Sequence, residues 1–277
     1  MVLDFYMDDV IRNAIKEDIN YIDTTADIVI PADQRGSAYF VAKAAGVLCG
    51  IDAAMRVFEL LDKTFECKVY FRDGDKLAVG DVICEFTGNM RCLLKGERTA
   101  LNLIQHMSGI ATETARCVEI VQGTNAAITD TRKTLPGLRA LQKYAVTVGG
   151  GKNHRYNLSD GAMLKDNHID ACGGITEAVK ALRARLGHMV KVEVETRDLD
   201  EVKEALEAGA DIIMLDNMDC PTMKAAVELV DGRALLEASG GITHDTLRDA
   251  AETGVDIISI GALTHSVQAF DISMKIS

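Results

Sequence analysis

Apolar and polar residues follow two different rhythms along the chain. Short apolar runs recur in the second half, at residues 126–131, 162–165, 190–195, 211–216, 234–239 and 256–261. Segments with the periodicity of amphipathic helices lie between the later runs, at residues 199–208, 222–230 and 244–253, and several of them open with Asp, Ser or Thr caps. Strands that alternate with helices predict a parallel sheet with crossover helices.

The first 110 residues show a different pattern. Ile51, Ala54 and Phe58 fall on one face of a helix, and residues 37–42, 68–72 and 82–86 have the composition of strands bounded by glycines. A long helix follows, marked by apolar residues between positions 94 and 107, and Gly109 is a candidate break in it. This mixture predicts an α/β sandwich.

The two patterns predict two domains. We expect an N-terminal α/β sandwich over residues 1–110 and an α/β barrel over residues 111–264, with the tail 265–277 packing back on the sandwich. A complete (β/α)₈ barrel has eight strands and about 250 residues. Six strands in a shorter stretch therefore favour an open, incomplete TIM-like barrel.

Composition excludes several classes of protein. No apolar run approaches the ~20 residues of a membrane span, and the first ten residues have neither a basic flank nor a signal-like apolar core. We therefore expect a cytoplasmic protein without a membrane partner. The seven cysteines form no C-x-x-C pair, which argues against a disulfide framework and a zinc site and favours reduced packing residues.

Charge is unevenly distributed. The formal net charge is −12, which makes nucleic-acid binding an unfavoured function because that affinity depends on clustered Lys and Arg. Between Thr131 and Lys165, however, seven basic residues accompany one acidic residue, Asp160. Two interpretations stay open: a solvated basic face, or a cleft for a multiply anionic small molecule.

Reactive side chains gather where the predicted strands end. In chain order they are Asp130, Arg132 and Lys133, then Lys165 and Asp166, then Glu195, then Asp216, then Ser239, Gly240 and Gly241, and finally Gly261. Barrel enzymes build their active sites at this end of the strands. The sequence therefore predicts one shared active site.

Two parts of this set suggest specific ligands. The glycines at 240 and 241 precede a predicted helix start near Thr243, and backbone amides there suit a phosphate, although a plain turn also needs glycine. Glu195 and Asp216 end adjacent strands and suit Mg²⁺, with Mn²⁺ as an open choice. The same carboxylates also fit a general acid/base pair, and Asp216 a helix cap.

The basic residues leave further alternatives. Lys165 suits either a Schiff-base nucleophile or an electrostatic contact to an anion. Arg132 and Lys133 suit carboxylate or phosphate binding. His154 and Arg155 follow three glycines on a loop that we expect to be flexible and to lie over the site. The chain has no Walker A, G-x-G-x-x-G or H-E-x-x-H motif.

Nine short blocks resemble one known family. TDTRKTLPGLR at 129–139, GGGKNHR at 149–155 and MLKDNH at 163–168 resemble the quinolinate phosphoribosyltransferases. The blocks at 97–102, 108–112, 192–195, 213–218, 236–242 and 259–266 resemble the same family, in its order along the chain. The resemblance covers nearly the whole chain. Ile22 and Leu135 depart from the family pattern, but neither position carries charge.

The resemblance implies an activity and roles for the residues. It implies transfer of phosphoribosyl from phosphoribosyl pyrophosphate to quinolinate with decarboxylation, giving nicotinate mononucleotide for NAD synthesis. It implies a homodimer in which Arg98 reaches the partner's active site. The implied quinolinate-binding residues are Arg98, Arg132, His154, Arg155 and Lys165. Lys133, Glu195 and Asp216 would face phosphoribosyl pyrophosphate and Mg²⁺, and Ser239, Gly240, Gly241 and Gly261 would hold the 5-phosphate.

Four other functions compete with this one. A molybdenum-transport-associated paralogue shares the fold but lacks the Lys-Asp-Asn-His block found at 165–168. A nicotinate phosphoribosyltransferase has a monocarboxylate substrate, for which so many cations are excessive. A lyase would form a Schiff base on Lys165. A catalytically inactive protein that binds quinolinate without turnover would not need both the carboxylate pair and the phosphate loop.

Overall fold

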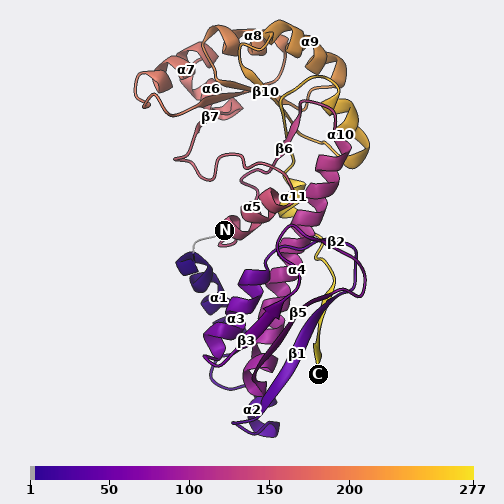
Figure 1. The fold of residues 1–277 in the computed structure, drawn as a ribbon. Helices are drawn as coiled ribbons and strands as arrows, with labels where there is room; N and C mark the ends of the chain where they lie inside the picture. Colours follow the sequence, from indigo (N-terminus) through magenta and orange to yellow (C-terminus); the bar gives the residue numbers. More distant parts are fainter. Residues whose placement is uncertain (1–3) are drawn as a thin grey trace. The chain divides into compact units, whose positions relative to one another are not determined.

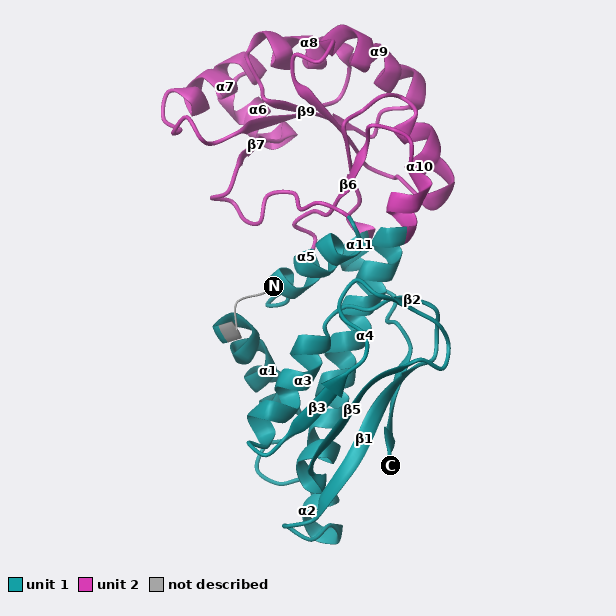
Figure 2. Ribbon diagram, in the orientation of Figure 1, with its two compact units in different colours: residues 1–115, 134–150, 263–277 teal, residues 116–133, 151–262 magenta. Residues whose placement is uncertain are grey.

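The computed structural model describes residues 4–277, and the chain divides into two compact units (Figures 1 and 2). The first unit comprises residues 1–115, 134–150 and 263–277, and the second comprises residues 116–133 and 151–262. Residues 134–150 thus belong to the first unit, whereas the sequence predicted a barrel domain that includes them. The domain boundaries after residues 110 and 264 stay a prediction.

The first unit is built on a four-stranded antiparallel sheet in the order β12-β1-β5-β3. Its strands are β1 (Arg35–Ala42), β3 (Glu66–Val69), β5 (Val82–Asn89) and β12 (Ile272–Ile276). The last strand of the chain pairs with the first, with Phe40 opposite Met274. A separate ribbon joins β2 (Gly46–Val47) to β4 (Lys76–Leu77).

Helices accompany the sheet in the first unit, and an aromatic core joins one of them to it. They are α1 (Asp4–Asp18), α2 (Ala26–Val29), α3 (Ile51–Leu61), α4 (Met90–Ile120), α5 (Arg139–Val148) and α11 (Ala262–His265). Phe58 of α3 stacks on Phe86 of β5 with ring centroids 4.9 Å apart, and Phe40 of β1 meets the edge of Phe86 at 5.2 Å. All three rings are almost fully buried, so the amphipathic α3 helix and the sheet form the predicted α/β sandwich.

One predicted strand is misplaced. The strand expected at residues 68–72 is β3, Glu66–Val69, and the chain turns soon after it. Gly74 adopts φ +97°, and the Asp75 carboxylate accepts a hydrogen bond from the Arg72 amide at 2.7 Å. These turn interactions outweigh the β propensity of Tyr70 and Phe71.

The predicted break at Gly109 is wrong. Helix α4 runs without interruption through this residue. A Cβ at Gly109 would lie 2.2 Å from the carbonyl oxygen of Gln268, so glycine allows the C-terminal segment to pass close to the helix backbone. Glycine here marks a close approach of two backbones.

The second unit is an open six-stranded parallel sheet in the order β6-β11-β10-β9-β8-β7. The strands are β6 (Ala127–Thr129), β7 (Ala162–Leu164), β8 (Val192–Thr196), β9 (Ile212–Asp216), β10 (Leu235–Ser239) and β11 (Ile257–Ser259). All six predicted strands are present, and the incomplete TIM-like barrel is confirmed. Because the strands are parallel, their carboxyl ends lie along one edge.

The helices of this unit line the outer side of the sheet (Figure 1). They are α6 (Asp166–Cys172), α7 (Ile175–Arg183), α8 (Leu199–Glu207), α9 (Cys220–Val230) and α10 (His244–Ala251). The Asp198 carboxylate caps α8 by accepting from the Glu201 amide at 2.9 Å, and Asp219 caps α9 in the same way through Thr222. The predicted Asp caps therefore fix where these helices begin.

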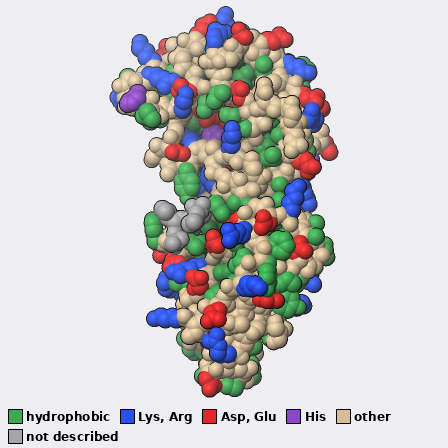
Figure 3. Space-filling model, in the orientation of Figure 1, with side chains coloured by type: hydrophobic (Ala, Val, Ile, Leu, Met, Phe, Trp, Pro, Cys, Tyr) green, Lys and Arg blue, Asp and Glu red, His purple; other side chains and the backbone are tan. Residues whose placement is uncertain are grey.

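The surface carries charges of both signs, and the prediction that the cysteines are packing residues is correct for the buried Cys49, Cys84 and Cys117 but wrong for the exposed Cys67 and Cys172. On the face shown in Figure 3, basic side chains are interspersed with acidic ones, without an extended field of one sign. All seven cysteines are free. Within residues 4–277, none of the helices combines the length and the apolar character needed to cross a bilayer.

The close packing at Gly109 predicts the effect of a methyl group. Gly109→Ala gains helix propensity but places Cβ against the Gln268 carbonyl oxygen, so we expect the free energy of unfolding to fall by about 1–3 kcal/mol. Gly187→Ala is the control, because nothing lies within 4 Å of a Cβ built there. Urea unfolding measures both. Equal stabilities for the two variants would contradict the close approach.

Candidate active site

A cavity of about 450 Å³ lies at the carboxyl ends of the strands of the second unit. Its lining residues come from five of the six strands and from the segments that follow β6 and precede β7. They are Thr131, Arg132, Lys133, His154, Arg155, Met163, Lys165, Glu195, Met214, Asp216, Glu237, Ser239 and Ser259. Eight of the residues predicted from sequence therefore meet in one cavity.

An acidic pair and a lysine meet at the ends of three neighbouring strands. Glu195 is the second-last residue of β8 and lines the cavity. Asp216 is the last residue of β9, and Lys165 directly follows β7. The Lys165 Nζ atom lies 3.1 Å from Glu195 Oε2. The Asp216 carboxylate accepts a hydrogen bond from the Asn217 side-chain amide at 2.9 Å. The two carboxylates supply hard oxygen donors facing the same space.

The segment 152–155 is anchored to β6. The Lys152 amide donates to the Ile128 carbonyl at 2.8 Å, and Lys152 forms a parallel bridge with Thr129. The fully buried Asp130 carboxylate accepts from the His154 amide at 2.9 Å and from the Asn153 side chain at 2.6 Å. The expectation of a flexible loop is therefore wrong for these residues, because a buried carboxylate fixes them.

Two guanidinium groups form the basic wall of the cavity. The Arg155 side chain donates to the Gly161 carbonyl at 2.9 Å, which holds it in the cavity wall. Burial lowers the pKa of Arg155 from its ordinary value, the neighbouring Arg132 guanidinium lowers it further, and Glu193 opposes the shift. Two cations held close together in a partly buried wall favour an anionic ligand.

Beneath this wall lies a buried group of one histidine and two glutamates. The His154 Nε2 atom lies 3.1 Å from Glu193 Oε2 and 3.6 Å from Glu237 Oε1. Glu193 is 4% exposed and Glu237 1% exposed. Burial, and then the charge of Glu193, raise the pKa of Glu237 to about 7, while His154 and Ser259 act in the opposite direction. This group could hold a proton or a divalent metal.

The glycine loop after β10 has the conformation that glycine permits. Gly240 has φ +94°, and a Cβ there would lie 2.2 Å from the Asn217 side-chain oxygen. The backbone amide of Asn217 donates a hydrogen bond to the Ser239 carbonyl at 2.8 Å. Thr243 then caps α10 with a capping box. The turn interpretation of this glycine is correct, and the loop also precedes a helix N-terminus suited to an anion.

The remaining predicted residues lie outside the cavity lining. Gly240 and Gly241 follow Ser239 in the loop, and Gly261 comes two residues after Ser259. Arg98 is exposed on α4, in the first unit. Two strand-end acids also serve other roles: Asp130 is buried beneath the loop, and Asp166 opens α6.

Sequence reasoning missed the lower layer of the cavity. Met214, Glu237 and Ser259 each lie two residues before a position that had been predicted, and Glu193 stands two residues before Glu195. Because side chains alternate across a strand, residues two apart share a face. This period of two was the available signal for the buried layer.

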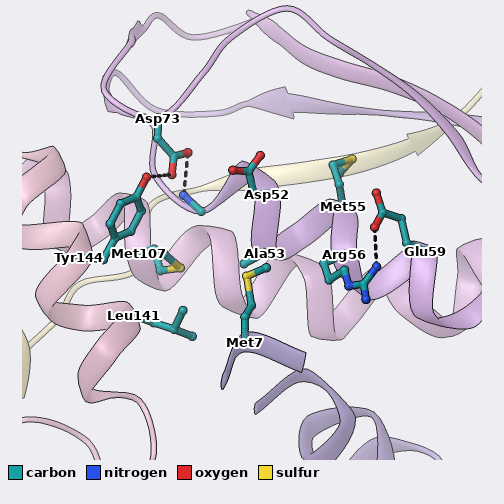
Figure 4. A pocket seen from close by; sticks show the side chains of 11 residues that line it. Met7, Asp52, Ala53, Met55, Arg56, Glu59, Asp73, Met107, Leu141 and Tyr144 are labelled. Atoms are coloured by element: carbon teal, nitrogen blue, oxygen red, sulfur yellow. Dashed lines mark hydrogen bonds and ion pairs between the residues drawn. The ribbon is translucent and has the colours of Figure 1, made fainter. Parts of the chain in front are cut away.

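A second cavity, of about 300 Å³, lies within the first unit (Figure 4). Met7, Met107 and Leu141 line its apolar side, and Tyr144 points toward Asp73 across it. The Asp73 carboxylate accepts from Tyr144 Oη at 3.0 Å and from the first amides of α3. These bonds fix α5 against α3, so the polar groups of this cavity have a structural role.

Known proteins resemble the chain over its whole length. Family models described as "Quinolinate phosphoribosyl transferase, N-terminal domain" and "C-terminal domain" match residues 23–108 and 110–275. A probable nicotinate-nucleotide pyrophosphorylase [carboxylating] of Bacillus subtilis is 47% identical, covering 94% of this chain and 90% of that protein. The Mycobacterium leprae nicotinate-nucleotide pyrophosphorylase [carboxylating] is 43% identical, covering 97% and 96%. The crystal structure of NadC from Streptococcus pyogenes matches with TM-score 0.97 and 42% identity, covering 100% and 98%.

The hydrogen bonds to the buried Asp130 carboxylate predict the effect of removing that carboxylate on stability and on the backbone at His154. Asp130→Ala leaves the His154 amide and the Asn153 side chain without their acceptor, so we expect a loss of about 1–3 kcal/mol in stability and faster hydrogen exchange at His154. Asp160→Ala is the matched control, because this exposed acid in the same segment bonds only a turn amide among the interactions observed. Similar exchange rates at His154 in both variants would contradict the anchor.

Proposed function

Because the chain belongs to the quinolinate phosphoribosyltransferase family, we propose that the cavity of the second unit is the site of the family's reaction. The enzyme transfers phosphoribosyl from phosphoribosyl pyrophosphate to quinolinate with decarboxylation, yielding nicotinate mononucleotide, pyrophosphate and carbon dioxide for NAD biosynthesis. The observation that supports the location is the meeting of basic side chains and two carboxylates around one cavity.

We assign quinolinate to the basic wall. Its two carboxylates need cations at fixed positions, and Arg132 and Arg155 offer forked donors suited to carboxylate oxygens. Lys165 adds a third cation at the mouth. His154 lines the cavity, but both nitrogens of its ring face protein groups: Nδ1 accepts from the Arg155 amide at 2.7 Å, and Nε2 faces the glutamates. His154 thus supports the wall from behind.

We assign Mg²⁺ to Glu195 and Asp216. The donor set fits, because Mg²⁺ binds through one or two carboxylates together with substrate phosphates, and both carboxylates face the cavity. When bound there, the ion would neutralise charge on the pyrophosphate as it leaves. The side chain of Glu195 is 16% exposed and already paired with Lys165, so binding would exchange one cation partner for another.

The phosphate groups of the sugar donor suit the remaining features. Ser239, Gly240 and Gly241 lead into α10, whose N-terminus favours a phosphate through the helix dipole, and Gly261 follows the next strand. Lys133 lines the cavity after β6 and provides a charge for pyrophosphate. Together these groups would hold the anomeric carbon above the basic wall.

The residues then act by position and charge. The wall orients the pyridine nitrogen toward the anomeric carbon, where the carbon–nitrogen bond forms as the bond to pyrophosphate breaks. Lys133 stabilises the negative charge of the departing group. The step needs no protein nucleophile, so Lys165 acts through its charge and its contact with Glu195 rather than through a Schiff base.

We further propose a cytoplasmic homodimer with shared active sites. Arg98 is exposed on α4 and is available to reach a partner's cavity. Phe5, Ile28 and Val29 of the same unit are 65–70% exposed, and exposed apolar side chains support an interface. The seven free cysteines support a reducing compartment.

The reaction predicts a strict substrate preference and a metal requirement. We expect nicotinate mononucleotide and carbon dioxide from quinolinate, phosphoribosyl pyrophosphate and Mg²⁺, little product from nicotinate, and loss of product when EDTA removes the metal. Chromatography of the nucleotide measures each arm. Product from nicotinate alone would indicate the salvage reaction instead, and full activity in EDTA would remove the metal from Glu195 and Asp216.

The shared site predicts complementation between two inactive variants. Arg98→Ala and Glu195→Gln should each lack activity, but a mixed dimer contains one site with both residues intact. Random reassembly should restore about a quarter of the wild-type rate, because half the dimers are mixed and each has one intact site. A mixture as inactive as its parents would show that Arg98 acts within its own subunit, and a monomeric mass in light scattering would contradict the dimer.

A further inference from the structure

The decarboxylation step requires a proton donor for a carbon atom of the pyridine ring. When the carboxylate next to the ring nitrogen leaves as carbon dioxide, its bonding electron pair stays on the ring carbon, which must then gain a proton. Among the residues that line the cavity, a suitable donor must hold its proton near neutral pH and lie on the side where quinolinate binds.

Glu237 has the surroundings of a protonated carboxylic acid. It lies on β10, two residues before Ser239, and lines the floor of the cavity while only 1% of its surface is exposed. The ionisable groups that face it are Glu193 from β8 and His154 from the segment anchored to β6, and the Ser259 hydroxyl faces it from β11. Two buried carboxylates this close do not both ionise easily.

The histidine tautomer favours a proton over a metal in this group. His154 Nδ1 accepts the Arg155 amide hydrogen at 2.7 Å, so the neutral ring carries its own hydrogen on Nε2. That hydrogen points at Glu193, 3.1 Å away. A metal ion would need the Nε2 lone pair, which this arrangement does not offer. His154 and Glu237 both line the cavity, so Glu237 faces the space that quinolinate would enter.

We propose that Glu237 is the acid that delivers a proton to the ring carbon from which carbon dioxide departs. This inference rests on the proposed location of the reaction in this cavity. The carbon–carboxylate bond breaks, its electron pair remains on the carbon, and the O–H bond of Glu237 breaks as the new C–H bond forms. Glu237 is left as a carboxylate and regains a proton from water that enters the cavity, which closes the cycle.

Lys165 is less suited to this role. Its side chain is 48% exposed, and its ammonium group is paired with Glu195 at the mouth of the cavity. Glu237 lies deeper, in a layer with Met163 and Met214. These apolar neighbours suit the product, since the leaving group enters as a charged carboxylate and departs as neutral carbon dioxide.

Glu237→Gln tests the proposal while preserving the size of the side chain. We expect kcat to fall by about 100-fold or more, with the KM values for quinolinate and phosphoribosyl pyrophosphate within about threefold of wild type. The wild-type kcat should decline as pH rises through about 7, because the raised pKa leaves Glu237 protonated only below that range. This alkaline decline should be absent in the variant.

Ser259→Ala gives a second test that does not depend on the first variant folding. The Ser259 hydroxyl lowers the pKa of Glu237, so its removal should move the alkaline decline to higher pH. A slower Glu237→Gln enzyme with an unchanged alkaline decline, or an unmoved decline in Ser259→Ala, would overturn the proposal. A wild-type enzyme that makes no product from quinolinate would remove the proposed function itself, which is a distinguishable failure.

Discussion

The carboxylate of Asp130 is the constraint on which the arrangement of the cavity depends. It is fully buried at the end of β6 and accepts hydrogen bonds from the backbone and side chains of the segment that follows α5. Since β6 is an edge strand of an open sheet, this segment occupies an edge that another strand would otherwise cover. The basic wall and the buried histidine both follow from that placement, because His154 and Arg155 come directly after the anchored residues.

The cavity uses carboxylates in two layers with different environments. Glu195 and Asp216 stand at the strand ends, where a lysine and an amide contact them and where water or a metal ion can reach. Glu193 and Glu237 lie one layer deeper, where burial and the charge of Glu193 favour a retained proton on Glu237. The same functional group therefore suits metal binding in one layer and proton donation in the next. On β8 the two layers are two residues apart, at Glu195 and Glu193.

Much of this arrangement could be predicted from the sequence, for identifiable reasons. The six strands follow from apolar runs between capped helices, and parallel strands necessarily bring Lys165, Glu195 and Asp216 to one edge. The role of Gly109 could not be predicted, because its contact with Gln268 joins residues far apart in the chain. The anchored loop was misjudged for the same reason: three glycines suggest mobility, whereas Asp130 fixes the residues that follow them. The strand-end pattern does not include the lower carboxylate layer, because Glu193 and Glu237 lie two residues before the positions where polar side chains mark the ends of the strands.

The pairing of β12 with β1 has a consequence for how the chain is made. Residues 272–276 are translated after every strand of the six-stranded sheet, yet they complete a sheet whose first strand begins at Arg35. During synthesis that sheet waits with one edge of β1 uncovered, while every residue of the six-stranded sheet has already been translated. The sheet that begins earlier in the chain is thus completed after the sheet that begins later, and an exposed strand edge is a site for pairing with other nascent chains.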